Sequence, residues 1–115
     1  MRVLYGIKNC DSVKKARAWL DQQQLEYQFH DFRTDGLTAT LLNDFVQRSD
    51  WQQLLNRRST TWKELPQSAR DDLDLDKACN LMLANPTLIK RPVLQTGDQL
   101  LIGFDPVQYN ALLTP

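Results

Sequence analysis

Hydrophobic positions change their spacing along the 115-residue chain, and each spacing predicts a different element. Residues 3–5 form a short apolar run typical of a buried strand, and large side chains alternate over 27–32 as in a second strand. Between these strands, three apolar residues recur at helical spacing and predict a helix over 12–24: Val13, Ala16 and Leu20. A strand, a helix and a strand in this order predict a parallel βαβ unit with a right-handed crossover.

The middle of the chain is spaced for helices. Thr38 can cap a helix with an apolar face made of Leu41, Leu42, Phe45 and Val46. Asp74 can cap another helix, whose spacing predicts a buried stripe of Leu75, Ala78, Cys79 and Met82. Since Cys79 lies in this stripe, we expect it to be a core residue. Asn85-Pro86 should end the helix.

The C-terminal part reads as a hairpin followed by a helix. Residues 93–95 and 100–102 are apolar runs around a Thr96-Gly97-Asp98 turn, and Asp105-Pro106 is a typical helix start. The element order is therefore β-α-β, a helical insertion, then β-β-α. We predict one α/β domain over 1–115, with a core of 1–36 and 87–115 and an insertion of about 37–86.

Charge and composition limit the classes of partner that we expect this protein to bind. Lys+Arg and Asp+Glu are equal at 14 each, so no net field favours nucleic acid or an anionic membrane as a partner. No apolar run reaches the roughly 18 residues of a membrane span, and no signal peptide is recognised, so we expect a cytoplasmic protein. Two cysteines without ligand spacing and the single histidine, His30, predict no metal site and no bound cofactor.

Cys10 is the main candidate for chemistry, because it lies between the first strand and the first helix. Unpaired N–H groups at a helix N-terminus favour the thiolate, and four basic residues against one acid lie between Lys8 and Arg17. The alternative is a small cysteine buried under the helix. A βαβ unit and a ββα unit with a cysteine at this turn form a thioredoxin-type arrangement.

Four sequence blocks narrow the interpretation: YGIKNCDS at 5–12, NRRSTTW at 56–62, IKRPV at 89–93 and LIGF at 101–104. Together they resemble the ArsC/Spx family of arsenate-reductase-like proteins, and within it the YffB branch. The resemblance implies a thioredoxin-like, glutaredoxin-type fold, with a βαβ plus ββα core and a helical insertion between strands 2 and 3.

The resemblance also implies site residues. Cys10 matches the redox nucleophile, and Arg91 matches an arginine that precedes a cis-proline, here Pro92. Arg58 approximates a further catalytic arginine, although strict alignment places Asn56 or Arg57 there. An ion pair with a structural role is the alternative for Arg91.

Residues around Cys10 and Pro92 are candidates for binding glutathione or another substrate. Lys8 can steer an anionic thiol, and Asn9 can donate a hydrogen bond to the sulfur or shape the turn. Ser12 can donate to the same sulfur, although capping the helix is its simpler role. The backbone beside Pro92 can pair with a bound peptide or glutathione.

Two departures from the family pattern limit the function. In the family pattern a third oxyanion-binding arginine falls near Ile102 or Gly103, where this sequence has no arginine. The loss of one such donor should weaken oxyanion binding by about 2–3 kcal/mol. Val13 stands three residues after Cys10, so the C-x-x-C disulfide switch of Spx regulators is absent.

The preferred function is a glutathione-coupled thiol oxidoreductase with Cys10 as its single redox cysteine and glutathione as co-substrate. One alternative is a non-enzymatic, Spx-like adaptor that binds RNA polymerase. Another is a glutaredoxin-coupled arsenate reductase with an altered anion site. The expected partners are thus a small-molecule thiol or an oxyanion, with glutaredoxin as a further candidate.

Overall fold

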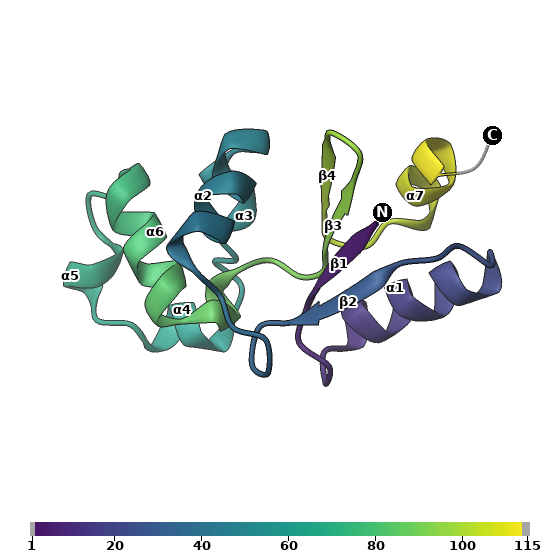
Figure 1. Cartoon of the computed structure of the whole chain (residues 1–115). Helices are drawn as coiled ribbons and strands as arrows, with labels where there is room; N and C mark the ends of the chain where they lie inside the picture. The colour runs from purple at the N-terminus through teal and green to yellow at the C-terminus, as the bar shows by residue number, and fades with distance from the viewer. Residues whose placement is uncertain (1, 114–115) are drawn as a thin grey trace. The chain divides into compact units, whose positions relative to one another are not determined.

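A computed structural model describes residues 2–113, which divide into two compact units (Figure 1). The core unit is built from two separate segments, up to Asp35 and from Arg91 onward, and the helical unit is Gly36–Lys90. The helical unit ends later than residue 86 because the segment after its last helix pairs internally. Ile89 forms a bridge with Leu55, and the Lys90 N–H donates to the Leu54 carbonyl at 2.8 Å.

A four-stranded sheet in the order β2-β1-β3-β4 forms the centre of the core unit. β1 (Val3–Gly6) pairs parallel to β2 (Gln28–Asp31) on one side and antiparallel to β3 (Val93–Thr96) on the other. β4 (Gln99–Ile102) forms a hairpin with β3. The parallel unit and the hairpin predicted from the sequence are both confirmed.

One face of this sheet is covered by α1 (Asp11–Gln22) and α7 (Pro106–Leu113). Alternate strand residues share this face with apolar helix residues, and the buried cluster contains Leu4, Ala16, Leu20, Leu94, Leu101 and Tyr109. At the hairpin turn Gly97 takes a φ of 57°, which glycine adopts without a Cβ penalty. Asp105 caps α7 by accepting the Val107 N–H at 3.0 Å, as predicted.

The helical unit contains five α-helices and one 3₁₀ helix: α2 (Ala39–Arg48), α3 (Trp51–Leu54), α4 (Thr60–Glu64), α5 (Gln67–Arg70), α6 (Leu75–Ala84) and η1 (Pro86–Leu88). The two predicted caps are confirmed. Thr38 Oγ1 accepts the Leu41 N–H at 3.1 Å, and Asp74 Oδ1 accepts the Lys77 N–H at 2.8 Å. Asn85 ends α6, as its Asn-Pro sequence predicts.

The buried stripe predicted for α6 is only half correct. Ala78 and Met82 are fully buried, but Leu75 is 44% exposed and Cys79 is half-buried. Helical spacing identifies residues on one side of a helix, whereas burial depends on where the neighbouring helix lies. Here α2 leaves a groove over Leu75 and Cys79, so the core assignment of Cys79 is wrong.

No helix within residues 2–113 is both long and apolar enough to cross a membrane.

Candidate functional site

The strand register brings the predicted core-unit site residues to one end of the sheet. Gly6, the last residue of β1, is paired with Asp31 at the end of β2. Because β3 runs antiparallel, its first residue, Val93, pairs with Tyr5, so Arg91 and Pro92 enter the sheet at the same end as the turn that follows β1. This end therefore collects the Cys10 turn and the Arg91-Pro92 segment.

Cys10 is the N-cap of α1. Its N–H donates to the Ile7 carbonyl at 3.1 Å and closes a tight turn, while its own carbonyl accepts the Lys14 N–H at 2.9 Å. The thiol makes no capping hydrogen bond and is partly exposed. The first N–H groups of a helix have no intrahelical partner, so the sulfur lies at the positive end of a twelve-residue helix dipole.

Gly6 determines how closely this helix approaches the sheet. A Cβ added to Gly6 would lie 2.6 Å from Cγ2 of Val13, which is fully buried. Only a residue without a side chain allows this contact. The start of α1, and Cys10 with it, is therefore held against the end of β1.

The polar candidates around Cys10 are exposed. Lys8 and Asn9 form the exposed part of the turn, and the side chains of Lys8 and of Lys14 and Lys15 on α1 make no ion pair with the described residues. Ser12 is not the cap, because Cys10 is the N-cap and the helix begins at Asp11, one residue before the predicted start. Its hydroxyl is exposed in the first helical turn.

Arg91 and Pro92 lie at the start of β3, and the peptide bond between them is cis, as the resemblance implied. Arg91 is partly buried, and its guanidinium makes no hydrogen bond or ion pair with residues 2–113. The structural ion pair considered for Arg91 is therefore not seen. Pro92 is buried, and its carbonyl accepts the Gly103 N–H at 2.8 Å. Ile102 and Gly103 thus reach the same end of the sheet without adding a charge.

Arg58 belongs to the helical unit, in an exposed loop at the start of α4. Asn56 Oδ1 accepts the Arg58 N–H at 3.1 Å, and the Asn56 N–H donates to Leu88 at 2.7 Å. The guanidinium of Arg57 lies 5.8 Å from the centre of the Trp62 ring, a cation–π contact. Arg58 has no such contact with the described residues, so of these two arginines it is the one whose guanidinium is free to bind a ligand.

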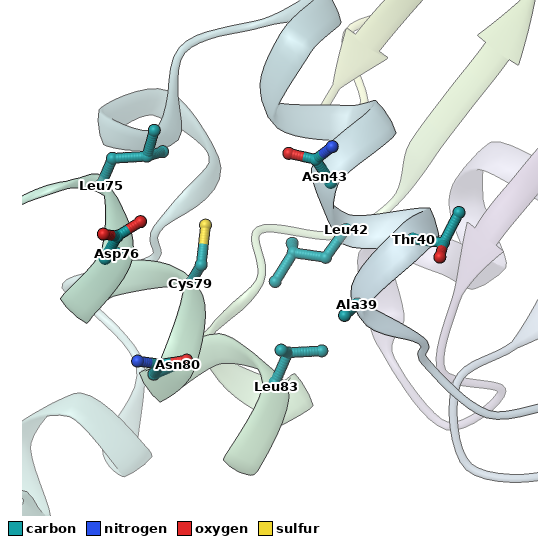
Figure 2. A pocket seen from close by; sticks show the side chains of 9 residues that line it. All are labelled: Ala39, Thr40, Leu42, Asn43, Leu75, Asp76, Cys79, Asn80 and Leu83. Carbon is teal, nitrogen blue, oxygen red and sulfur yellow. The ribbon is translucent and has the colours of Figure 1, made fainter.

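Cys79 lies in a different environment, a groove of about 590 Å³ between α2 and α6 (Figure 2). Its sulfur points into the space shared with Leu42 and Asn43 of α2. Burial, and then the nearby Asp76 carboxylate, raise the pKa of this thiol above its ordinary value. Cys79 is therefore partly exposed but ionises to the thiolate less readily than an ordinary cysteine. Both cysteines are free.

Two residues that support the site were missed from the sequence. Gly6 has no signal beyond its place at a strand end, because the need for glycine arises from the Val13 contact. Asp31 is a buried carboxylate at the end of β2 that accepts the Lys8 N–H at 3.3 Å. The sequence signal for Asp31 was an acidic residue among the large side chains of the predicted second strand. Within residues 2–113, no group of three or more His, Cys, Asp or Glu side chains could hold a metal ion.

The sequence is similar to proteins of one family over nearly its whole length. A family model described as the ArsC family matches residues 5–112. An uncharacterized protein of Haemophilus influenzae is 43% identical over 111 residues, covering 96% of this chain and 97% of that protein. The global transcriptional regulator Spx of Lactiplantibacillus plantarum is 26% identical over 107 residues, covering 91% of this chain and 80% of the regulator.

Solved structures agree with this result. A YffB protein is 46% identical with a TM-score of 0.95, and the alignment covers 99% of this chain and 100% of that one. An arsenate reductase (ArsC) related protein from Brucella melitensis is 46% identical with a TM-score of 0.79, covering 99% and 95% of the two chains. A glutaredoxin from Archaeoglobus fulgidus, 11% identical with a TM-score of 0.50 and coverage of 99% and 86%, shares the fold alone. The thioredoxin-like fold expected from the sequence is confirmed.

Proposed function

The chain belongs to the ArsC family, a family of thiol oxidoreductases with a thioredoxin-like fold, and on this basis we propose that it is a glutathione-coupled thiol oxidoreductase. One observation carries the proposal. Cys10 is a partly exposed thiol at the N-terminus of α1, is not used as a hydrogen-bonding cap, and shares the end of the sheet with the unpaired Arg91.

The proposed reaction needs one protein cysteine. The Cys10 thiolate attacks the glutathione sulfur of a mixed disulfide between glutathione and a substrate thiol. The original S–S bond breaks, the substrate thiolate leaves and takes a proton, and Cys10 becomes bound to glutathione. A second glutathione thiolate then attacks this adduct, which releases oxidised glutathione and restores the Cys10 thiolate.

Each candidate residue has a role in this scheme. Arg91 binds a glutathione carboxylate through two parallel hydrogen bonds, and the N-terminus of α1 stabilises the anionic sulfur. Lys8 steers the anionic thiol, while Asn9 and Ser12 donate to the sulfur. The backbone beside Pro92 pairs with the glutathione peptide. Arg58 is proposed as a second anion ligand, and the reducing cytoplasm as the location.

The proposal is tested by intact-mass analysis after exposure to oxidised glutathione. We expect one adduct, mapped to Cys10, which added reduced glutathione removes. The Cys79→Ser variant should form the same adduct, and Cys10→Ser should form none. Failure of the wild-type protein to form any adduct would contradict the proposal.

A second candidate function is an Spx-like adaptor that binds RNA polymerase, which the similarity to Spx regulators favours. Val13 at the position of the second switch cysteine argues against redox control of such an adaptor. Binding of purified RNA polymerase by Cys10→Ser as strongly as by the wild type, with no thiol transfer, would favour it. Rapid arsenate-dependent oxidation of glutathione would instead favour arsenate reduction, for which the neutral Ile102 and Gly103 leave one cationic ligand too few.

A further inference from the structure

Asp31 is a buried carboxylate whose two oxygens accept hydrogen bonds from two different parts of the backbone. Oδ2 accepts the Lys8 N–H at 3.3 Å, and Oδ1 accepts the Arg33 N–H at 2.8 Å. Asp31 is 8% exposed. Its own N–H donates to Asp35 Oδ2 at 2.9 Å, so the segment that follows β2 folds around this residue.

The Lys8 bond matters because Lys8 lies inside the turn that ends at Cys10. This turn is closed by the bond between the Cys10 N–H and the Ile7 carbonyl, and the Lys8 and Asn9 side chains are exposed. Asp31 ties the exposed part of the turn to the end of β2. The parallel pairing of Gly6 with Asp31 brings the carboxylate to this place.

We propose that Asp31 is a positioning residue for Cys10. It acts through the Lys8 N–H, which fixes the turn and therefore the direction in which the thiol leaves the start of α1. This inference rests on the proposed function for its effect on glutathione chemistry. The geometric part, a turn held by Asp31, can be tested without it.

The test is Asp31→Asn. An amide has a single acceptor oxygen, and its NH₂ group cannot accept an N–H. The shorter bond to Arg33 retains the oxygen, so the Lys8 N–H loses its acceptor. We expect faster hydrogen exchange at the Lys8 amide, measured by NMR, and a Cys10 reaction with iodoacetamide or oxidised glutathione slowed about three- to tenfold, the range expected for one lost hydrogen bond.

The direction of the change separates positioning from simple electrostatics. Removing a negative charge from the site would by itself favour the thiolate and speed the reaction of Cys10. Slower labelling of Cys10, with labelling of Cys79 unchanged in the same molecule, therefore indicates lost orientation. Asp35→Asn is the matched control, because it removes the same charge but keeps an oxygen for the one side-chain bond that Asp35 accepts from the Asp31 N–H.

A second variant removes the same bond from the donor side. Lys8→Pro has no N–H, and proline is compatible with the second position of such a turn. If Asp31 acts through Lys8, adding Asp31→Asn to Lys8→Pro should slow Cys10 no further. The proposal is overturned if Lys8 exchange is unchanged in Asp31→Asn, if Cys10 is labelled faster, or if Asp35→Asn has the same effect. If the wild type forms no glutathione adduct while iodoacetamide labelling responds as described, the proposed function fails and the positioning role stands.

Discussion

The two cysteines are both partly exposed, yet they lie in different surroundings. Cys10 lies at the N-terminus of a helix, with Lys8, Lys14 and Lys15 close in sequence. Cys79 lies in the middle of α6, in a groove where burial and Asp76 oppose ionisation. Partial exposure alone therefore does not predict which of the two thiols is the nucleophile. The backbone dipole and the sign of the neighbouring charges separate these two thiols.

The strongest test of this contrast removes each sulfur in turn. Cys10→Ser should abolish thiol transfer between glutathione and a small mixed disulfide, because the reaction needs a thiolate nucleophile. Cys79→Ser should retain the wild-type rate. Steady-state rates of thiol transfer measure this difference, and circular dichroism spectra show whether both variants are folded. Equal losses of the transfer rate in the two variants would contradict the proposed difference between Cys10 and Cys79.

Arg91→Lys tests whether the Cys10 region depends on a planar ligand as well as on positive charge. An ammonium offers one point charge where a guanidinium offers two parallel donors. We expect a loss of about 1–3 kcal/mol in transition-state stabilisation, with a nearly unchanged melting temperature.

Rates of adduct formation and thermal melts should be measured side by side. Arg48→Lys is the matched control, since Arg48 forms an exposed ion pair with Asp44 at 3.1 Å. An Arg91→Lys protein that melts early but reacts normally would make Arg91 a structural residue.

Alkylation at neutral pH compares the two thiols within one molecule. Cys10 should be labelled on the order of tenfold faster than Cys79, as a helix-terminus effect of about 1–2 kcal/mol would give. Because the pKa of Cys79 is raised, its thiolate forms only at alkaline pH, and its labelling should rise steeply there. Asp76→Asn removes one cause of this shift and should speed Cys79 about two- to threefold at mildly alkaline pH. Peptide mapping of the label measures each site.

These cases indicate which parts of the structure the sequence could predict. The caps at Thr38, Asp74 and Asp105 depend on the chemistry of neighbouring residues, and all three were correct. The half-exposure of Cys79 depends on where α2 packs, which helical spacing does not encode.

The supporting residues of the site show the same limit. Asp31 supports the Cys10 turn only because the parallel register places the end of β2 beside that of β1. Gly6 matters only because Val13 packs against it. The candidate nucleophile, Cys10, is proposed from local sequence and family resemblance, whereas the residues that hold it depend on tertiary contacts.

Gly6→Ala would show how much of the contrast comes from the close approach of α1. The added methyl group would lie 2.6 Å from Val13 Cγ2, and overpacking of this kind costs about 1–3 kcal/mol in unfolding free energy. Labelling of Cys10 should slow while that of Cys79 is unchanged. Val13→Ala should recover part of the stability in the double variant, as measured by urea unfolding. Additive losses would indicate that the two side chains do not compete for the same space.

Tyr109→Phe should have the smallest effect and leave the ratio of the two labelling rates unchanged. Tyr109 packs edge-on against Trp19 of α1, and its buried hydroxyl has no hydrogen-bond partner among residues 2–113. Losing it should change stability by about 0–1 kcal/mol in the favourable direction.

This substitution also has a pH signature. Burial raises the pKa of Tyr109 above its ordinary value of 10.0. At pH values well below 10.0, the hydroxyl is neutral in the folded and in the unfolded chain, so it adds no pH dependence to stability. As the pH rises through this value, the unfolded chain ionises while the folded chain stays neutral, and the folded state loses stability. The wild type should therefore lose more stability than Tyr109→Phe between about pH 8 and about pH 11 in urea titrations. Parallel curves would contradict this.

The division into two units also bears on how the chain reaches its fold. The side chains of Tyr5 and Gln95 are hydrogen-bonded across the sheet although they are 90 residues apart in sequence. Closing so long a loop costs conformational entropy before the central strands gain any contact. The helical unit is continuous, Gly36–Lys90, and depends on contacts that are nearer in sequence. Early collapse of the helical unit would shorten the loop that must close between β1 and β3. This unit contains neither Cys10 nor Arg91, yet it would speed assembly of the end of the sheet where both lie.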